Sequence, residues 1–296
     1  MTAALEANGL GKRYGGTWGL SDCTLAIPSS RVVGLVGPNG AGKTTLLHLA
    51  VGLLQPTAGS LTVLGGRPGT TSAQLARVGF VAQDAPTYTG LSIGDHLRFG
   101  AWMNPGWDAR LAEDRLRRLG LDPRQKAGRL SGGQRAQLAL TLAIAKRPEL
   151  LVLDEPVASL DPLARREFLQ GLMEGVAEHG ASVILSSHIV ADLQRVCDYV
   201  VVLVGSRVQV AGDIQELLAT HHRLTGPRHD VDDLPSDLQL VGESHTDRQS
   251  TLVVRTDRPI LDPAWLVEQL DLEDLVLAYM TRAREHDRRP HLEVHR

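Results

Sequence analysis

Short apolar runs alternate with helix-like patterns through most of this chain. In five runs, apolar residues would occupy both faces of the strand if the run were extended. These runs span residues 31–37, 78–83, 150–154, 182–187 and 199–204. Strands of this kind are typical of parallel sheets that are covered by helices on both faces. Between the runs, segments such as 43–54 place apolar residues at helical spacing. The pattern therefore predicts an α/β fold built around a mainly parallel sheet.

Two segments before residue 150 depart from this alternation. Residues 5–36 carry short β-rich runs broken by Gly and Pro, and we predict an N-terminal antiparallel β subdomain there. A turn at 55–60 then leads to a short strand at 61–66. Residues 84–149 instead contain the amphipathic pattern 108-DARLAEDRLRRLGL-121, in which Asp108 is the expected N-cap. We therefore predict an inserted helical subdomain over about 84–149.

The composition changes again from about residue 221. Residues 221–296 contain no lysine and seven of the eleven histidines. We predict a hairpin of 238–243 with 251–256, and then a helix over 263–283. The last stretch, 284–296, is predicted to be a mobile tail.

These histidines, 221-HH-222 among them, lack the paired spacing of a metal motif, and a solvated surface is the expectation. We accordingly divide the chain into a main domain at 1–220 and a C-terminal accessory extension at 221–296.

Composition excludes several classes of protein. The net charge of −3 gives no overall basic footprint, so no nucleic-acid partner is expected. No apolar run approaches the roughly 20 residues of a membrane helix, and residues 1–16 lack the apolar core of a secretory signal. Cys23 and Cys197 cannot form a disulfide framework. We interpret both as buried thiols in a reducing compartment.

A glycine-rich loop separates the first apolar run from the first helical pattern. Gly37, Gly42, Lys43 and Thr44 satisfy the spacing G-x-x-x-x-G-K-[ST] in 37-GPNGAGKTT-45. Gly40 and Gly42 let phosphate oxygens approach the backbone amides, and a helix N-terminus adds partial positive charge. Lys43 supplies a full charge, and the Thr44 hydroxyl is a ligand suited to Mg²⁺. The loop predicts a P-loop NTPase core.

Two carboxylates follow the apolar run of 150-LLVLDEP-156. Asp154 comes at the carboxyl end of the predicted strand, which is the edge where α/β sheets bind ligands. It can hold Mg²⁺ together with Thr44, either directly or through water. Glu155 points elsewhere, because neighbouring residues at a strand end diverge, and it is placed to polarise an attacking water.

A second glycine-rich helix start follows at 130-LSGGQ-134. Ser131 is its expected N-cap, and Gly132 and Gly133 expose backbone amides to an anion. With the stretches above, it makes residues 4–220 resemble the ATP-binding-cassette (ABC) ATPases. In the family's order the similar motifs are Walker A at 37–45, the Q-loop at 80–84, the signature at 130–134, Walker B at 150–156, the D-loop at 159–162 and the switch histidine at 186–190.

The resemblance implies a dimer in which each ATP lies between Walker A of one copy and the signature of the other. It assigns catalysis to Glu155, His188 and Gln83, and Mg²⁺ binding to Thr44, Gln83 and Asp154. Tyr14 would stack on adenine, and Asp161 would report on the partner's site. The nucleotide-binding residues that it implies are Tyr14, Gly37, Pro38, Asn39, Gly40, Ala41, Gly42, Lys43, Thr44, Thr45, Ser131, Gly132, Gly133, Gln134 and Asp161.

The resemblance also implies partners. A homodimer or heterodimer would power a separate transmembrane permease, which places the protein in the cytoplasm at the inner face of the cell membrane. The stretches 61-LTVLGGRP-68 and 272-LEDLVLAYM-280 resemble the ABC-2-type exporter branch, so export is the expected direction. The alternative is a soluble ABC ATPase that serves iron–sulfur assembly or macromolecular remodelling.

The predicted helical subdomain is the expected docking place for a permease helix. Its apolar candidates are Tyr88, Leu91, Phe99, Trp102 and Met103. These side chains could form a groove for a partner helix, or they could fill the subdomain's own core.

Overall fold

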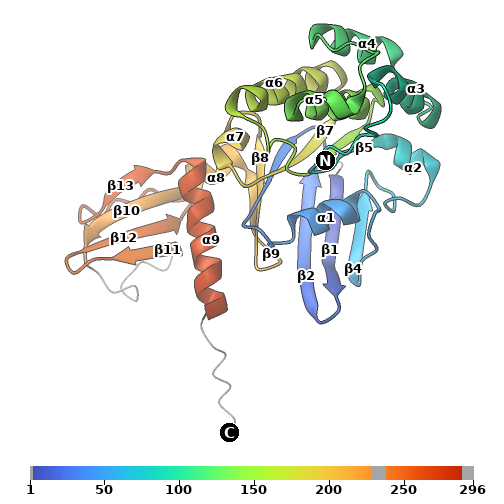
Figure 1. Cartoon of the computed structure of the whole chain (residues 1–296). Coiled ribbons are helices and arrows are strands. Elements are labelled where there is room, and N and C mark those ends of the chain that lie inside the picture. Colours follow the sequence, from blue (N-terminus) through green and yellow to red (C-terminus); the bar gives the residue numbers. More distant parts are fainter. Residues whose placement is uncertain (1–2, 229–237, 289–296) are drawn as a thin grey trace.

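A six-stranded sheet forms the centre of the molecule, in the order β5-β6-β7-β3-β8-β9. The computed structural model describes residues 3–228 and 238–288. All neighbouring pairs are parallel except β8 with β9, so the predicted parallel sheet is confirmed (Figure 1). The strands are β3 (Val32–Val36), β5 (Val78–Val81), β6 (Leu150–Leu153), β7 (Ser182–Ser187), β8 (Tyr199–Val204) and β9 (Arg207–Asp213).

Each face of this sheet belongs to a different apolar core, because successive residues of a strand point to opposite faces. Val32 and Val36 of β3 join a core with α5 (Gly132–Ala145) and α6 (Pro162–His179). Val33 and Leu35 join a second core with α1 (Lys43–Ala50) and the N-terminal strands. The short helix α7 (Val190–Gln194) follows β7 in the sequence, and the short helix α8 (Ile214–Thr220) follows β9.

The N-terminal strands form a separate antiparallel sheet, as predicted, in the order β2-β1-β4. Its strands are β1 (Ala3–Tyr14), β2 (Thr17–Pro28) and β4 (Ala58–Val63). Helix α1 packs between this sheet and the central one (Figure 1), so the phosphate loop that precedes α1 is fixed from both sides.

Helices dominate the segment that was predicted to be a helical subdomain. Within it lie α3 (Ile93–Met103), α4 (Ala109–Arg118), the 3-10 turn η1 (Ala127–Arg129) and α5, while α2 (Ser72–Arg77) comes earlier, before β5. Asp108 caps α4 as expected, because the Leu111 N–H donates to its Oδ1 at 3.0 Å. Ile93, Leu116 and Leu138 belong to a small core of their own.

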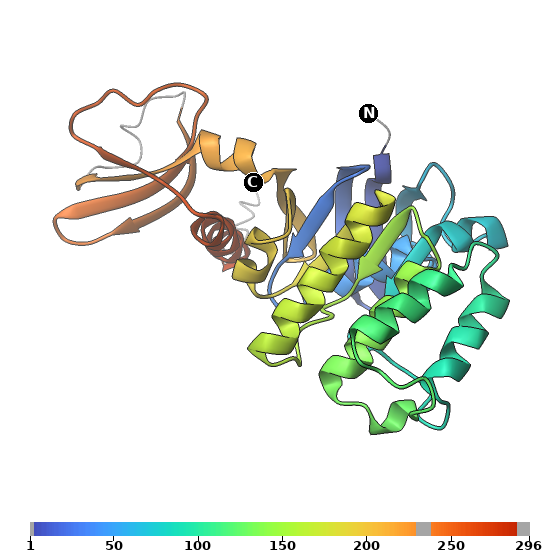
Figure 2. The ribbon, with the colours of Figure 1, turned by 90° about the horizontal axis from the view of Figure 1, so that it is seen from above.

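The C-terminal extension is a four-stranded antiparallel sheet of order β11-β12-β10-β13, followed by a helix. Its elements are β10 (His221–Pro227), β11 (Gln239–His245), β12 (Gln249–Arg255), β13 (Leu266–Gln269) and α9 (Leu272–Arg288). The predicted hairpin is confirmed by the pairing of β11 with β12. Helix α9 lies between this sheet and the main domain (Figure 2).

Three C-terminal predictions need correction. The helix predicted over 263–283 begins only at Leu272, because Leu266–Gln269 pairs with β10 as an edge strand. The predicted tail is helical up to Arg288, while 289–296 lie outside the described residues. His221 is fully buried, against the expected solvated surface, since it hydrogen-bonds Leu217 and Tyr279.

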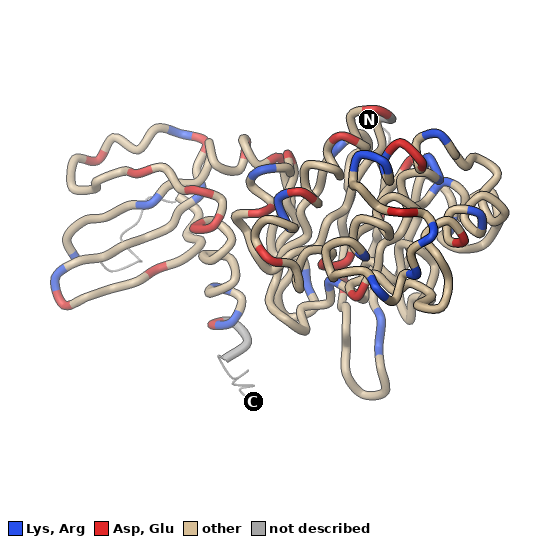
Figure 3. Tube along the Cα trace, turned by 45° about the horizontal axis from the view of Figure 1, so that its top comes forward, with Lys and Arg blue, Asp and Glu red and all other residues tan. Residues whose placement is uncertain are grey.

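The distribution of charged residues and the hydropathy of the helices match what the composition indicates. Lys and Arg are interspersed with Asp and Glu along the trace (Figure 3). In residues 3–228 and 238–288 no helix combines the length and apolar character needed to cross a membrane. Burial raises the pKa of both cysteine thiols, that of Cys23 to about 11, so neither is a reactive thiolate at neutral pH.

Candidate functional site

The phosphate loop between β3 and α1 can be built only with glycine at two places. Gly42 has φ of 102°, and a Cβ there would lie 2.4 Å from the Gly19 carbonyl oxygen. At Gly37 a Cβ would lie 2.1 Å from the Leu203 carbonyl oxygen. Any side chain would therefore push the loop off the neighbouring backbone. The loop therefore packs closely on the neighbouring backbone and leads directly into the N-terminus of α1.

Lys43 is held in the middle of this loop. The side chain is only 5% exposed, and its Nζ donates to the Gly37 carbonyl oxygen at 2.8 Å. The same Nζ lies 3.2 Å from Glu155 Oε1 and forms a largely buried ion pair. The positive charge is thus fixed where the loop and the end of β6 meet.

The two carboxylates after β6 are positioned by Ser186 of β7. The Ser186 hydroxyl donates to Asp154 Oδ1 at 2.8 Å, and its oxygen accepts the Glu155 N–H at 2.8 Å. Glu155 has φ of 43°, a left-handed conformation that costs a non-glycine residue about 1–3 kcal/mol. This backbone twist separates the two carboxylates, so Asp154 is buried while Glu155 faces the loop.

His188 completes a chain of polar contacts. Its Nδ1 lies 3.0 Å from Glu155 Oε2, so the ring N–H donates to the carboxylate. Lys43, Glu155 and His188 therefore form one continuous line across the site. A cavity of about 590 Å³ opens beside it, lined by Gly19, Asn39, Gly40, Ala41, Gly42, Lys43, Thr44, Thr45, Gln83, Glu155, Ala158 and His188.

Tyr14 lies at the edge of this cavity rather than in its lining. A Cβ on Gly19 would come within 2.7 Å of the Tyr14 ring, so the ring is packed against Gly19. The Tyr14 side chain is otherwise exposed, with the Lys12 ammonium 5.8 Å from its centroid. Neither Gly19 nor Ser186 was among the residues predicted from sequence. No local pattern marks them, since each acts through a neighbour that is distant in the chain.

The signature residues are not brought to this cavity. Ser131 caps α5, because its Oγ accepts the Gln134 N–H at 3.2 Å while Gln134 Oε1 accepts the Ser131 N–H at 3.0 Å. Gly132 is exposed and Gly133 partly exposed at this helix start. Asp161 caps α6 by accepting the N–H groups of Leu163 and Ala164. Within one copy, these residues serve helix starts away from Lys43.

Comparison with known proteins identifies the family. The family described as "ABC transporter" matches residues 20–158. The Nod factor export ATP-binding protein I of Cupriavidus pinatubonensis (strain JMP 134 / LMG 1197) is 35% identical over 226 residues, which cover 74% of this chain and 69% of that protein. The chain belongs to the ABC transporter ATP-binding proteins. This is a family of ATPases, and the cassette's phosphate loop and Walker B strand lie in the matched segment.

Another relative of this ABC protein has a name that specifies import rather than export. The Fe(3+) ions import ATP-binding protein FbpC 1 of Rhodococcus jostii (strain RHA1) is 35% identical over 226 residues, 74% of this chain. The match spans 65% of that relative's length. A solved ATP-binding subunit of an ABC transporter is 29% identical, with a TM-score of 0.65 over 72% of this chain and 91% of that one. The cassette is thus shared by importers and exporters.

Proposed function

We propose that this protein binds and hydrolyses ATP as one of two cassette subunits that power a separate membrane permease. The observation that carries the proposal is the line of Lys43, Glu155 and His188 beside a glycine loop. A fixed cation, a carboxylate base and a hydrogen-bonding imidazole are the groups needed to bind a triphosphate and activate water at its terminal phosphorus.

The loop geometry supports an order of events. The amides of residues 39–45 and the N-terminus of α1 receive the phosphates. Lys43 then exchanges its Glu155 partner for the β- and γ-phosphate oxygens, which frees the carboxylate. Glu155 accepts a proton from the attacking water, while His188 donates to Glu155 and fixes its orientation.

The donor set near the loop fits a magnesium ion. The Thr44 hydroxyl and the Gln83 amide line the cavity, and the Asp154 carboxylate is held at the adjoining strand end by Ser186. Oxygen ligands of this kind suit Mg²⁺. When bound there, the ion would neutralise charge on the β- and γ-phosphates, with Thr44, Gln83 and Asp154 as its protein ligands.

The separation of Ser131 from the cavity supports a site that is shared between two copies. The helix start at 131–134 presents a cap and two glycine amides to solvent. Such a start binds anions, and a second copy can press it against the γ-phosphate. Hydrolysis then removes the shared charge, and the copies part. Asp161 follows β6 by a short loop and would sense the same contact.

Mixed dimers test this sharing. Lys43→Ala removes the loop charge, and Ser131→Asp keeps a side chain that can cap the helix while its negative charge repels phosphate. Each variant alone should lose ATPase activity. An equal mixture should recover roughly a quarter of the wild-type rate, because half of the pairs are mixed and each keeps one site of two. Two differently tagged Lys43→Ala preparations are the control, and a mixture no more active than its parents contradicts sharing.

The helical subdomain supports a docking surface for the permease. Tyr88, Phe99, Trp102 and Met103 are exposed, Trp102 by 81%, and Leu91 is exposed as well. They are therefore not core residues. Trp102→Glu should abolish ATP-driven transport by the assembled complex and leave the isolated subunit's ATPase rate unchanged. Leu261→Glu, at an exposed position of the extension, is the control. Parallel loss of both activities with loss of folding would contradict docking.

We propose export as the direction of transport. The supporting features are the resemblance of 272-LEDLVLAYM-280 in α9 to exporter subunits and the similarity to the Nod factor export protein. The subunit would then work in the cytoplasm, at the inner membrane face with its permease. ATP-driven accumulation of cargo inside inverted membrane vesicles would support export, and depletion would indicate import.

A further inference from the structure

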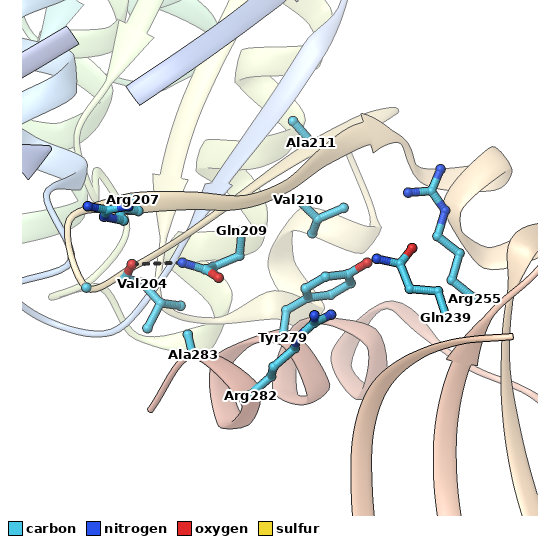
Figure 4. A pocket seen from close by; sticks show the side chains of 11 residues that line it. Val204, Arg207, Gln209, Val210, Ala211, Gln239, Arg255, Tyr279, Arg282 and Ala283 are labelled. Atoms are coloured by element: carbon cyan, nitrogen blue, oxygen red, sulfur yellow. Dashed lines mark hydrogen bonds between the residues drawn. The ribbon is translucent and has the colours of Figure 1, made fainter. Parts of the chain in front are cut away.

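A second cavity, of about 750 Å³, lies between the main domain and the C-terminal extension. One wall is the β8–β9 hairpin of the cassette, and the others are β11, β12 and α9 (Figure 4). None of its lining residues contributes to the nucleotide cavity. The volume is within the usual range for small-molecule sites, about 300–1,000 Å³.

Three arginines line this cavity, and no carboxylate among residues 3–228 and 238–288 does. Arg207 begins β9, Arg255 ends β12, and Arg282 comes from α9. Among residues 3–228 and 238–288, no acidic group is within salt-bridge distance of Arg207 or Arg255. Figure 4 shows Arg207 and Arg255 on opposite sides of Tyr279, with Arg282 next to the tyrosine. The positive charges are thus distributed along the cavity.

Tyr279, which lines the cavity, is held in place by a buried histidine. His221 Nδ1–H donates to the Leu217 carbonyl at 2.7 Å, which leaves Nε2 to accept the Tyr279 hydroxyl proton at 2.9 Å. Burial raises the pKa of the Tyr279 hydroxyl, and the nearby charges of Arg255 and Arg282 oppose that rise. The Gln209 amide donates to the Val204 carbonyl at 3.2 Å. A ligand would therefore meet a preformed site.

We propose that this cavity binds a small phosphorylated molecule with at least two anionic groups. Guanidinium forks match phosphate oxygens in geometry and retain their charge at any physiological pH. Arg207 and Arg255 lie on opposite sides of Tyr279, so each calls for its own anionic group, and a phosphate group carries about −1.5 to −2 at neutral pH. Phosphate of this kind occurs in soluble metabolites and in lipid headgroups, and the site recognises what the two share.

Binding there would act on the nucleotide site through the hairpin. The Ser206 carbonyl accepts the Ser21 N–H at 2.8 Å, and the Ser206 hydroxyl donates to the Trp18 carbonyl at 3.0 Å. These contacts flank Gly19, which lines the nucleotide cavity. The preceding Leu203 carbonyl packs on Gly37 of the phosphate loop. A ligand that clamps β9 to α9 would thus stiffen one wall of the ATP site and tune its turnover.

Calorimetric titration of the full chain with inorganic pyrophosphate, without ATP, tests the site independently of any transport function. Arg255→Gln should weaken binding by about tenfold or more, as loss of a charged hydrogen bond does. Arg248→Gln, which removes the same charge from the turn at the other end of β12, should leave binding unchanged. Lys43→Ala should retain the Arg255-dependent binding, because it changes only the phosphate loop and Lys43 does not line this cavity. Thermal melting of each variant confirms its fold.

The outcomes separate the two sites and the two ligand sources. Absence of binding in the wild type, or binding that is lost in Lys43→Ala and unaffected by Arg255→Gln, would overturn the proposal. Co-sedimentation with vesicles of cardiolipin in phosphatidylcholine supplies the second arm, because the cardiolipin headgroup carries two phosphate groups. If capture depends on Arg255, the headgroup is the ligand. If pyrophosphate binds and vesicles are not captured, the ligand is a soluble metabolite.

Discussion

The phosphate loop and the second cavity gather positive potential in different ways. The loop uses backbone amides and one lysine from nine consecutive residues, 37–45, held between two sheets. The second cavity uses side chains from three elements, with Arg207 on β9, Arg255 on β12 and Arg282 on α9. A site built from consecutive residues is fixed by local covalent geometry. A single substitution there should therefore cause a large loss of ATP binding or hydrolysis. A site lined by separate elements depends on how those elements pack. Substitutions there should therefore reduce ligand affinity or stability by smaller, graded amounts.

Glu155→Gln should produce the largest effect on the contiguous site. The amide keeps the shape of the side chain but cannot accept the proton of water. We expect ATP to bind and the hydrolysis rate to fall by about 10²–10⁴-fold, the usual share of a general base. Single-turnover hydrolysis measures the rate, with Glu113→Gln on the exposed face of α4 as the control. An unchanged rate would remove Glu155 from catalysis.

Lys43→Ala should have the next largest effect, on nucleotide affinity. It removes a buried cation that contacts both the Gly37 carbonyl and Glu155. We expect ATP to bind at least about 30-fold more weakly, because loss of one member of a buried charge pair costs about 2 kcal/mol or more. Fluorescent-nucleotide titration measures this, and Lys126→Ala, at an exposed position, is the control. Retained affinity would mean that the loop amides suffice.

His221→Leu should have a smaller effect, and it probes the domain junction. The substitution leaves the buried Tyr279 hydroxyl without its acceptor, which costs about 1–3 kcal/mol of unfolding free energy. Pairing it with Tyr279→Phe should cost less than the sum of the two single changes. Chemical denaturation measures each cost, and His222→Leu is the neighbouring control. If the double variant lost as much stability as the two single variants added together, the His221–Tyr279 hydrogen bond would not be the source of the loss.

The same histidine gives the junction a pH dependence. Burial lowers the pKa of folded His221, so the unfolded chain binds a proton that the folded protein does not. The contribution of His221 to stability is therefore complete above about pH 6.5 and declines as the pH falls below that value. Denaturation at pH 7.5 and 5.5 should show this acid loss in the wild type and a smaller one in His221→Leu. Equal losses would place the titration elsewhere.

Sequence alone predicted the contiguous parts of the structure well. The five apolar runs became central strands because each is buried on both faces and needs no distant partner to be recognised. Asp108 and Ser131 were predicted as caps because capping is a local interaction over three residues. Lys43 and Glu155 likewise met at 3.2 Å, since their motifs fix them at strand ends of one sheet.

Distant pairings were not visible in the sequence. Leu266 and Val267 continue the helical spacing of the residues after them, yet they form an edge strand because β10 offers an unpaired side. His221 was assigned to a surface because its partner Tyr279 lies 58 residues away. Ser186 and Gly19 escaped notice for the same reason, and so did the convergence of the three arginines.

The core that α9 shares with the cassette bears on how this protein can be divided. Leu272, Leu275 and Val276 belong to the same apolar cluster as Val204, Val210 and Leu217. Cutting the chain at residue 220 would remove α9 and expose the apolar cassette side chains that pack against it. The cassette would therefore be a poor candidate for separate expression or for grafting into a chimera. Evolutionary exchange of the C-terminal part would have to carry the facing surface of β9 and α8 with it.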